Sequence, residues 1–521
     1  MLTVETILTL LGLTTLLAFL AHKANVPYPI FLVIAGMAVA FVPGLPAVSL
    51  DPQLVFLFFL PPILYAAGYF TSWRDFRANL FSITLLAVGL VIATTAAVAA
   101  VVVALVPGVP WPAALVLGAI VSPPDAVAAT AIAQRVRLPR RIVTILEGES
   151  LVNDATGLVL LKFASAAIVT GHLAVLPGIA EFCVMVVGGV AVGLALGWLF
   201  AQAQRFLDDT ILATTASLLV SFVTYIAAEH LHVSGVLATV TAGVVQGRYV
   251  PRILSSKTRI ESTAVWQTFI FLLNALVFVL IGLQLPVVLK TLDWPWTVVV
   301  DGIFATFGTM VVVRLVWMFP GAYLPRYLFR KYRASNPYPP WQSVVVVGWA
   351  GMRGVVSLAA ALSLPLVLAD GRPFPARSLI IFITFAVILG TLVFQGLTLA
   401  PLVRWLRVEE DLSGEREERH ARLALAEAAL DHLDGTMEKQ NLQAHQVHGV
   451  RQEYVQRVRS LKGFEAEGPA HAPLELSREL RRTAVEAQRK QLLKLRDEEV
   501  IGDDVLHRLQ HELDLEEVRM R

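Results

Sequence analysis

The sequence predicts an all-α polytopic membrane protein with about thirteen transmembrane helices and a soluble helical tail. Of the 521 residues, 56% are hydrophobic and only 16% are charged, and the mean hydropathy is +0.67. Soluble chains of this length carry about a quarter charged residues. Residues 1–407 hold 24 Lys and Arg against 15 Asp and Glu, whereas residues 408–521 hold 18 against 25. We therefore expect a membrane domain over 1–407 and a water-soluble tail over 408–521, and no ordinary soluble enzyme.

Apolar runs between polar, Pro or Gly breaks define the candidate spans, each near the roughly 20 residues that cross a bilayer. Residues 1–22 lack the basic start and cleavage site of a signal peptide, so they are interpreted as the first span. The expected spans cover residues 4–22, 28–44, 52–71, 80–106, 112–134, 141–170, 176–204, 209–228, 234–247, 262–288, 294–320, 341–368 and 374–405.

The basic residues of 1–407 are distributed unevenly between the loops on the two sides of these spans. One set of alternate loops contains almost all of them, and the opposite set contains only Lys290, Arg372 and Arg377. Cytoplasmic loops are enriched in Lys and Arg. The pattern therefore predicts an N-terminus outside the cell and a cytoplasmic tail, in what we expect to be a bacterial plasma membrane.

Two further features limit the class of protein. The single Cys183 excludes an intrachain disulfide and any multi-cysteine metal site. The total charge of +2 gives no indication of nucleic-acid binding, and the sequence suggests no bound cofactor.

The span over 112–134 contains a predicted helix break at Ser122-Pro-Pro-Asp125. Each proline lacks an N–H group and its ring clashes with the preceding turn, so two in succession should end the helix. Irregular backbone at membrane depth is tolerated only beside protein or a wet cavity. Asp125 follows the break and is placed to accept hydrogen bonds from the first N–H groups of the next helix segment.

The span over 141–170 carries an oxygen-rich patch, Glu149-Ser150-Leu-Val-Asn153-Asp154. Residues three and four apart share one helix face, which places Ser150 beside Asn153 and Asp154. Hard cations prefer carboxylate, hydroxyl and carbonyl oxygens. We expect Na⁺ to bind at Asp154 and Ser150, with an oxygen from the break at Ser122 to Asp125. The alternative is a purely structural hydrogen-bond network between helices.

The span over 341–368 contains Arg353 among three glycines, which predicts a second break. Because arginine stays charged, Arg353 needs a buried anion, and Glu149 is the candidate for a structural ion pair. Arg314 lies about two turns from the expected cytoplasmic end of its span, so we expect its side chain to snorkel to the interface. Two breaks at similar depths, near Asp125 and Arg353, suggest two inverted six-helix repeats.

These residues together resemble the NhaP-type branch of the cation/proton antiporter superfamily. The resemblance rests on the Gly148-Glu-Ser-Leu-Val-Asn-Asp154 segment, on Ser122-Pro-Pro-Asp-Ala-Val127 and on Gly351-Met-Arg-Gly-Val-Val-Ser357. It implies a homodimer of thirteen-span protomers in which Asp154 carries both ion and proton, Asn153 assists it and Ser150 is a ligand. Because the sequence has Asn-Asp here, it also implies electroneutral exchange. Many relatives have Thr where Pro124 stands, so Ser122 is the stand-in hydroxyl.

The expected function is therefore exchange of Na⁺, or of K⁺ or Li⁺, for H⁺ by alternating access. The Asp154 site should cross the low-dielectric barrier only when a proton or a cation neutralises its carboxyl group. This requirement couples the transport of the cation to that of the proton. The alternative is a cation channel, or a cation-sensing receptor that signals through the tail. In the tail, apolar residues recur at helical spacing within 423–433 and 480–495, separated by a linker at 463–473, which predicts a helical hairpin or coiled coil.

Overall fold

The computed structural model divides into two units, residues 1–411 and 412–521, which are considered separately. Apart from one isolated bridge between Val367 and Pro373, the regular secondary structure of the described residues is helical. The structure describes residues 4–24, 26–42, 51–136, 138–172, 175–328, 333, 338–368, 371–408, 413–440 and 444–463, with single residues 488, 491, 494 and 509.

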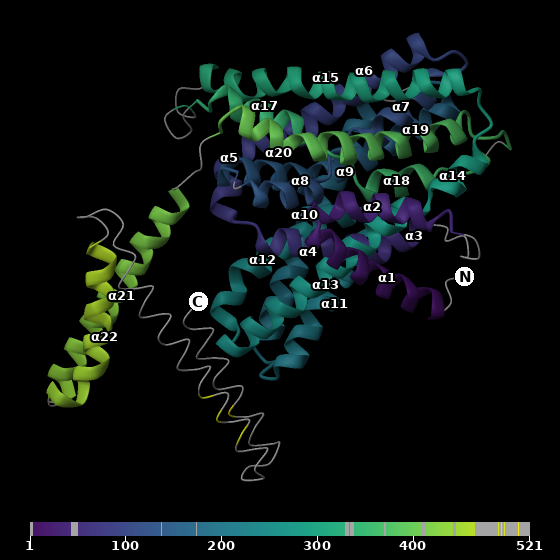
Figure 1. Ribbon diagram of the computed structural model, residues 1–521. Coiled ribbons are helices and arrows are strands. Elements are labelled where there is room, and N and C mark those ends of the chain that lie inside the picture. The colour runs from purple at the N-terminus through teal and green to yellow at the C-terminus, as the bar shows by residue number, and fades with distance from the viewer. Residues whose placement is uncertain are drawn as a thin grey trace. The chain divides into compact units, whose positions relative to one another are not determined.

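The first unit is a bundle of helices, several of them interrupted (Figure 1). Its first half contains α1 (Val4–Lys23), α2 (Tyr28–Val39), α3 (Pro52–Leu54), η1 (Val55–Phe59), α4 (Leu60–Phe70), α5 (Trp73–Thr84), η2 (Leu85–Leu90), α6 (Val91–Leu105), α7 (Trp111–Val121), α8 (Ala126–Arg135) and α9 (Arg140–Thr170). Its second half contains α10 (Val175–Gln204), α11 (Thr210–His230), α12 (Gly235–Ile253), α13 (Ser256–Leu283), α14 (Leu285–Thr291), α15 (Trp296–Leu328), α17 (Trp341–Trp349), α18 (Val355–Leu362), α19 (Arg377–Gly390), η3 (Thr391–Gln395) and α20 (Gly396–Trp405).

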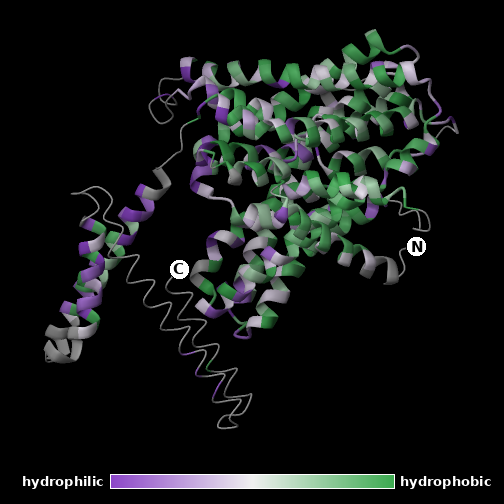
Figure 2. Cartoon of the chain, viewed as in Figure 1, coloured by the Kyte–Doolittle hydropathy of each residue, from purple (hydrophilic) through white to green (hydrophobic). Residues whose placement is uncertain are grey.

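Within the described residues, nine helices are long and apolar enough to cross a membrane, and α1 and α2 add shorter apolar stretches. Figure 2 shows these helices as mainly hydrophobic, with paler and hydrophilic residues between the hydrophobic ones and at several helix ends. The prediction of an all-helical, multi-span membrane domain is confirmed. The count of thirteen spans and the inverted repeats stay predictions.

The helices of the first unit form two groups in Figure 1. In the upper group, hereafter the broken-helix group, α7 packs against α6 and α9, and α15 packs against α6 and α17. In the lower group, α12 packs against α4, α10 and α11, and α13 packs against α2. Helix α9 touches both groups, because it also contacts α4 and α12. The helix that carries the oxygen-rich patch, α9, is therefore in contact with both groups.

Three long helices contain one turn of π-helix, at η1, η2 and η3. Such turns occur mostly as bulges and are frequent at functional sites. One of them supports the second break directly, since the hydroxyl of Thr391 in η3 accepts a hydrogen bond of 3.1 Å from the backbone N–H of Arg353.

In the second unit, α21 (Ser413–Gln440) and α22 (Ala444–Gly463) pack against one another. Two ion pairs join them, Arg451–Asp434 at 2.8 Å and Lys462–Glu427 at 2.7 Å. The hydrogen bond from Arg451 lowers the pKa of Asp434. Helix α21 includes the expected helix at 423–433, α22 was not expected, and the expected helix at 480–495 lies outside the described residues, apart from three single positions.

Candidate functional site

Both predicted helix breaks are present and they touch one another. The first separates α7, which ends at Val121, from α8, which begins at Ala126. The second separates α17, which ends at Trp349, from α18, which begins at Val355. The backbone N–H of Asp125 donates a hydrogen bond of 2.7 Å to the carbonyl of Met352. Two irregular segments far apart in the sequence thus satisfy each other's backbone groups inside the bundle.

Asp125 caps the second half of the first broken helix, as predicted. Its Oδ1 accepts a hydrogen bond of 2.8 Å from the N–H of Val127, and its position at the N-terminus of α8 matches the positive end of the helix dipole. The other carboxylate oxygen lies directly on Gly354, where an added Cβ would come within 1.8 Å of it. Position 354 therefore admits no side chain without displacing Asp125.

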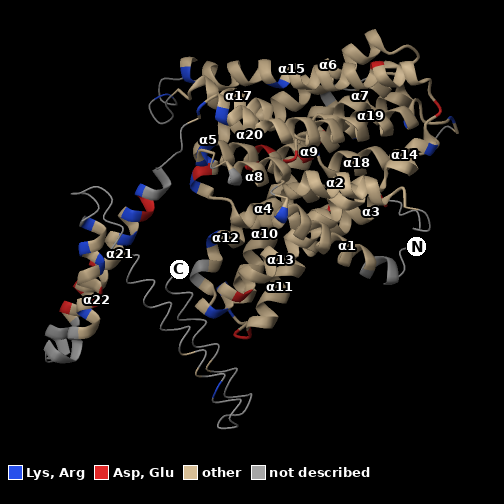
Figure 3. Ribbon diagram, viewed as in Figure 1, with Lys and Arg blue, Asp and Glu red and all other residues tan. Residues whose placement is uncertain are grey.

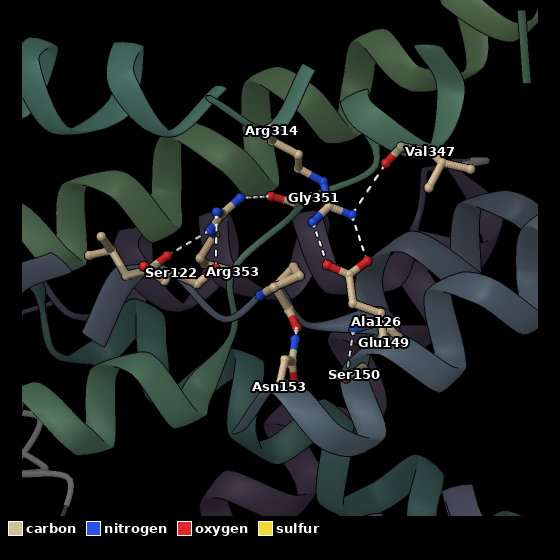
Figure 4. A network of polar contacts seen from close by, with 11 residues as sticks. Ser122, Ala126, Glu149, Ser150, Asn153, Arg314, Val347, Gly351 and Arg353 are labelled. Carbon is tan, nitrogen blue, oxygen red and sulfur yellow. Dashed lines mark hydrogen bonds and ion pairs between the residues drawn. The ribbon is translucent and has the colours of Figure 1, made fainter. Parts of the chain in front are cut away.

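Asn153 and Ser150 hold the break itself and the start of α8 to α9 (Figure 4). The Nδ2 of Asn153 donates a hydrogen bond of 2.6 Å to the carbonyl of Pro124. The hydroxyl of Ser150 accepts one of 3.3 Å from the N–H of Ala126. The Oδ1 of Asn153 is buried and has no hydrogen-bond partner among the described residues. One neutral oxygen therefore remains without a hydrogen bond on the residue that precedes Asp154.

Asp154 is 9% exposed and lies one turn beyond Ser150 on α9. It lines a small cavity of about 10 Å³ together with Pro123 at the first break and Ser357 on α18. This volume is near the smallest that can hold one water molecule. Within the described part of the chain we find no hydrogen bond to its carboxylate. Ser357, which the sequence analysis quoted in a motif but did not assign to the site, belongs to this cavity wall.

The ion pair of Glu149 is formed with Arg314, not with Arg353. Nη1 and Nη2 of Arg314 donate to the two carboxylate oxygens at 2.6 and 2.8 Å, and Nη2 also reaches the carbonyl of Val347 at 3.3 Å. The two side chains are 1% and 2% exposed. The predicted Glu149–Arg353 pair was therefore wrong, and so was the expectation that Arg314 snorkels.

Two physical features explain this correction. Helix α15 continues through Pro320 and Pro325 to Leu328, which places Arg314 about 21 Å from its C-terminal end at 1.5 Å per residue. That depth is too great for the side chain to reach the interface. In addition, an added Cβ on Gly351 would come within 2.5 Å of the Arg314 side chain, so the missing side chain at 351 provides the space through which Arg314 reaches Glu149.

Arg353 instead caps the first half of the broken helix. Its Nε donates to the carbonyl of Val121 at 2.9 Å, its Nη2 to that of Ser122 at 3.3 Å, and its Nη1 to that of Gly351 (Figure 4). The carbonyls of Val121 and Ser122, at the end of α7, have no helical partners because the helix is interrupted there. A cation at a helix C-terminus also complements the helix dipole. Arg353 is thus satisfied by backbone oxygens rather than by a carboxylate.

The side chain of Ser122 points to a different helix from the one expected. Its hydroxyl bonds to Thr95 on α6 at 2.9 Å and to the carbonyl of Gly118. The structure therefore brings Asp154, Asn153, Ser150 and Asp125 together around the first break, but it does not bring the Ser122 hydroxyl to the Asp154 cavity.

Comparison with known proteins identifies the family. The family model for sodium/hydrogen exchangers, transmembrane, matches residues 7–405. An uncharacterized Na⁺/H⁺ exchanger of Mycobacterium tuberculosis is 34% identical over 511 residues, which is 96% of this chain and 93% of that protein.

A sodium, potassium, lithium and rubidium/H⁺ antiporter of Bacillus subtilis is 32% identical, over 93% of this chain and 73% of that protein. The solved structure of the sodium proton antiporter MjNhaP1 from Methanocaldococcus jannaschii at pH 8 covers 77% of this chain and 97% of its own, with a TM-score of 0.61 at 17% identity, and so shares its fold. The chain belongs to the sodium/hydrogen exchanger family, and the predicted NhaP-type resemblance is confirmed.

Proposed function

We propose that this protein exchanges Na⁺ for H⁺ by alternating access, with the two cations competing for the carboxyl group of Asp154. The observation that carries the proposal is that Asp154 differs from the other charged residues around the breaks in its hydrogen bonding. Asp125, Glu149, Arg314 and Arg353 each form hydrogen bonds through their charged groups, although the Nε of Arg314 has no partner among the described residues. Asp154 is buried beside a small cavity, and the described residues supply no hydrogen bond to it. A buried charge in a membrane protein is costly and by default indicates function.

Na⁺ is proposed to bind Asp154 and Ser150, with Asn153 as the helper and Asp125 across the break. The buried Oδ1 of Asn153 and the hydroxyl of Ser357 supply further neutral oxygens of the kind that hard cations prefer. Ser122 contributes through its position in the break rather than through its hydroxyl. Potassium and lithium are the other candidate passengers, which is in keeping with the name of the Bacillus subtilis relative.

The same arrangement supports one-for-one, electroneutral exchange. One carboxylate takes either one proton or one monovalent cation, and only the neutralised form crosses the low-dielectric barrier between the two sides. A carrier that is neutral in both loaded forms moves no net charge per cycle. The chain itself needs no cofactor for this cycle.

We further propose a homodimer of thirteen-span protomers in a bacterial plasma membrane, with the N-terminus outside. The matched breaks at α7–α8 and α17–α18 support two inverted repeats. The tail from 408 to 521 is proposed to be cytoplasmic and to serve dimerisation or regulation, and the mixed-charge hairpin of α21 and α22 is consistent with an aqueous environment.

The test is Na⁺-driven proton movement in proteoliposomes of the purified protein, reported by a pH-sensitive dye. Asp154→Asn is nearly isosteric but cannot ionise, so we expect it to abolish exchange while the protein still folds. The matched control is Asp301→Asn, which makes the same change at an exposed carboxylate and should retain exchange. Undiminished exchange in Asp154→Asn would overturn the proposal. Saturable, strictly coupled exchange also distinguishes a carrier from a channel.

A further inference from the structure

A second cavity, hereafter the arginine cavity, lies at one end of the broken-helix group and apart from Asp154. It has a volume of about 540 Å³ and is bounded by α5, α9, α15, α17 and the residues directly after α20. Ligand pockets typically occupy about 300–1,000 Å³. The cavity is therefore large enough for a small organic molecule or a lipid headgroup with part of its chain.

Three arginines from three separate segments line this cavity: Arg141 on α9, Arg326 on α15 and Arg407 after α20. Its described lining contains no Asp or Glu. Lys and Arg lie at this end of the group near α17, and near α5 they lie beside acidic residues (Figure 3). Arg326 is only 2% exposed, and its Nη1 donates a hydrogen bond to the carbonyl of Ala322 on the same helix, which fixes the guanidinium group at the cavity rather than in water. The Nε of Arg141 is fixed by a hydrogen bond of 3.2 Å to Asn79.

Two helix N-termini open into the same cavity. Pro139 and Pro340, which precede α9 and α17, both line it, and neither helix has a side-chain cap. A helix N-terminus carries a partial positive charge and free N–H groups, and so favours phosphate and other anions. Guanidinium groups match phosphate oxygens in geometry as well as in charge. Most of the remaining wall is apolar and includes Leu86, Ile145 and Met318.

We propose that the arginine cavity binds a phosphate-bearing anion, either the headgroup of an anionic lipid or a free phosphate compound. Arg141, Arg326 and Arg407 hold the phosphate group, and the apolar wall contacts the rest of the molecule. This inference does not depend on which ion the Asp154 site transports.

The arginine cavity shares lining residues with the surroundings of the buried Glu149–Arg314 ion pair. Val347 lines the cavity, and its carbonyl accepts a hydrogen bond from Arg314. Ile145, which also lines the cavity, lies one turn before Glu149 on α9. A ligand here therefore joins α9, α15 and α17, the helices that hold Glu149 and Arg314. We expect binding to raise the thermal unfolding temperature, because a ligand that binds only the folded state stabilises it.

The experiment measures the thermal unfolding midpoint of the purified full-length protein in detergent. One arm titrates phosphatidylglycerol against zwitterionic phosphatidylcholine, and the other titrates ATP and inorganic phosphate. A saturable rise with phosphatidylglycerol alone identifies a lipid, and a saturable rise with a soluble compound identifies a free phosphate ligand; either supports the site. The proposal is overturned when no compound produces a saturable rise, or when phosphatidylcholine produces the same rise as phosphatidylglycerol.

Charge-matched variants test whether the arginines are responsible. Arg407→Gln should weaken the apparent affinity of the stabilising compound about tenfold, equivalent to about 1.4 kcal/mol. Arg404→Gln removes the same charge from an exposed residue at the end of α20 that does not line the cavity, and should leave the affinity within about twofold of wild type. Equal weakening by both variants would refute the site and leave a general surface-charge effect. Arg326→Gln provides a second reading, and Arg407→Gln decides alone where the buried substitution prevents folding.

Discussion

Removing the carboxylate of Glu149 should destabilise the protein more than any single exposed charge change. Glu149→Gln removes the negative charge and replaces one of the two acceptors, at 2.6 and 2.8 Å from Arg314, by an N–H donor, so it leaves Arg314 charged and 2% exposed. Breaking a buried ion pair by removing one partner costs about 3–5 kcal/mol, because the other charge stays buried and uncompensated. Replacing both charges costs much less. We therefore expect Glu149→Gln combined with Arg314→Met to recover most of the loss.

The assay is chemical denaturation of the detergent-solubilised protein, applied as a double-mutant cycle to Glu149 with Arg314 and, separately, to Glu149 with Arg353. Either single change leaves a buried unpaired charge and the double change removes both, so the first cycle should give a coupling free energy of at least about 3 kcal/mol, at or above the upper end for contacting residues. The second should give a clearly smaller value, because Arg353 is satisfied by the carbonyls of Val121 and Ser122. Stronger coupling of Glu149 to Arg353 than to Arg314 would refute the pairing.

Two further predictions concern the contacts around the first break. Gly354→Ala places a Cβ 1.8 Å from Asp125 Oδ2, so it should lower both the unfolding temperature and the exchange rate. The control Gly12→Ala meets nothing within 4 Å and should change neither. A Gly354→Ala variant with unchanged stability and exchange would contradict the contact. Ser122→Ala should leave the Na⁺ concentration for half-maximal exchange nearly unchanged, because its hydroxyl bonds to Thr95, while Ser150→Ala should raise it severalfold; equal effects in dye-reported exchange would return Ser122 to the ligand set.

The sequence was sufficient for features that depend on local chemistry. Two adjacent prolines remove two N–H donors and crowd the preceding turn, so the break after Val121 could be predicted without any tertiary information, although the pair at Pro61 and Pro62 lies within a continuous helix. Asp125 follows that break, and its role as the cap of α8 follows from the unsatisfied N–H groups of any helix start. The oxygen-rich face of α9 likewise follows from helical periodicity.

The sequence was insufficient where a contact depends on depth and on neighbouring helices. The expected end of the eleventh span at residue 320 assumed that Pro320 stops the helix, but α15 passes through it and through Pro325. Prolines inside membrane helices are tolerated because neighbouring groups satisfy the freed carbonyls. That difference of two turns changed Arg314 from an interfacial side chain into the buried partner of Glu149, and it left Arg353 with backbone oxygens that only the tertiary fold supplies.

The charges around the breaks also account for the proposed stoichiometry. Arg353 at the C-terminus of α7 and Asp125 at the N-terminus of α8 each oppose the local helix dipole, and Arg314 neutralises Glu149. These four charges sum to zero, so among the five charged groups that lie at the two breaks or pair beside them, Asp154 leaves one net negative charge. One proton or one monovalent cation removes it. A divalent cation would leave a net positive charge, which a low-dielectric interior penalises as it penalises the unneutralised carboxylate.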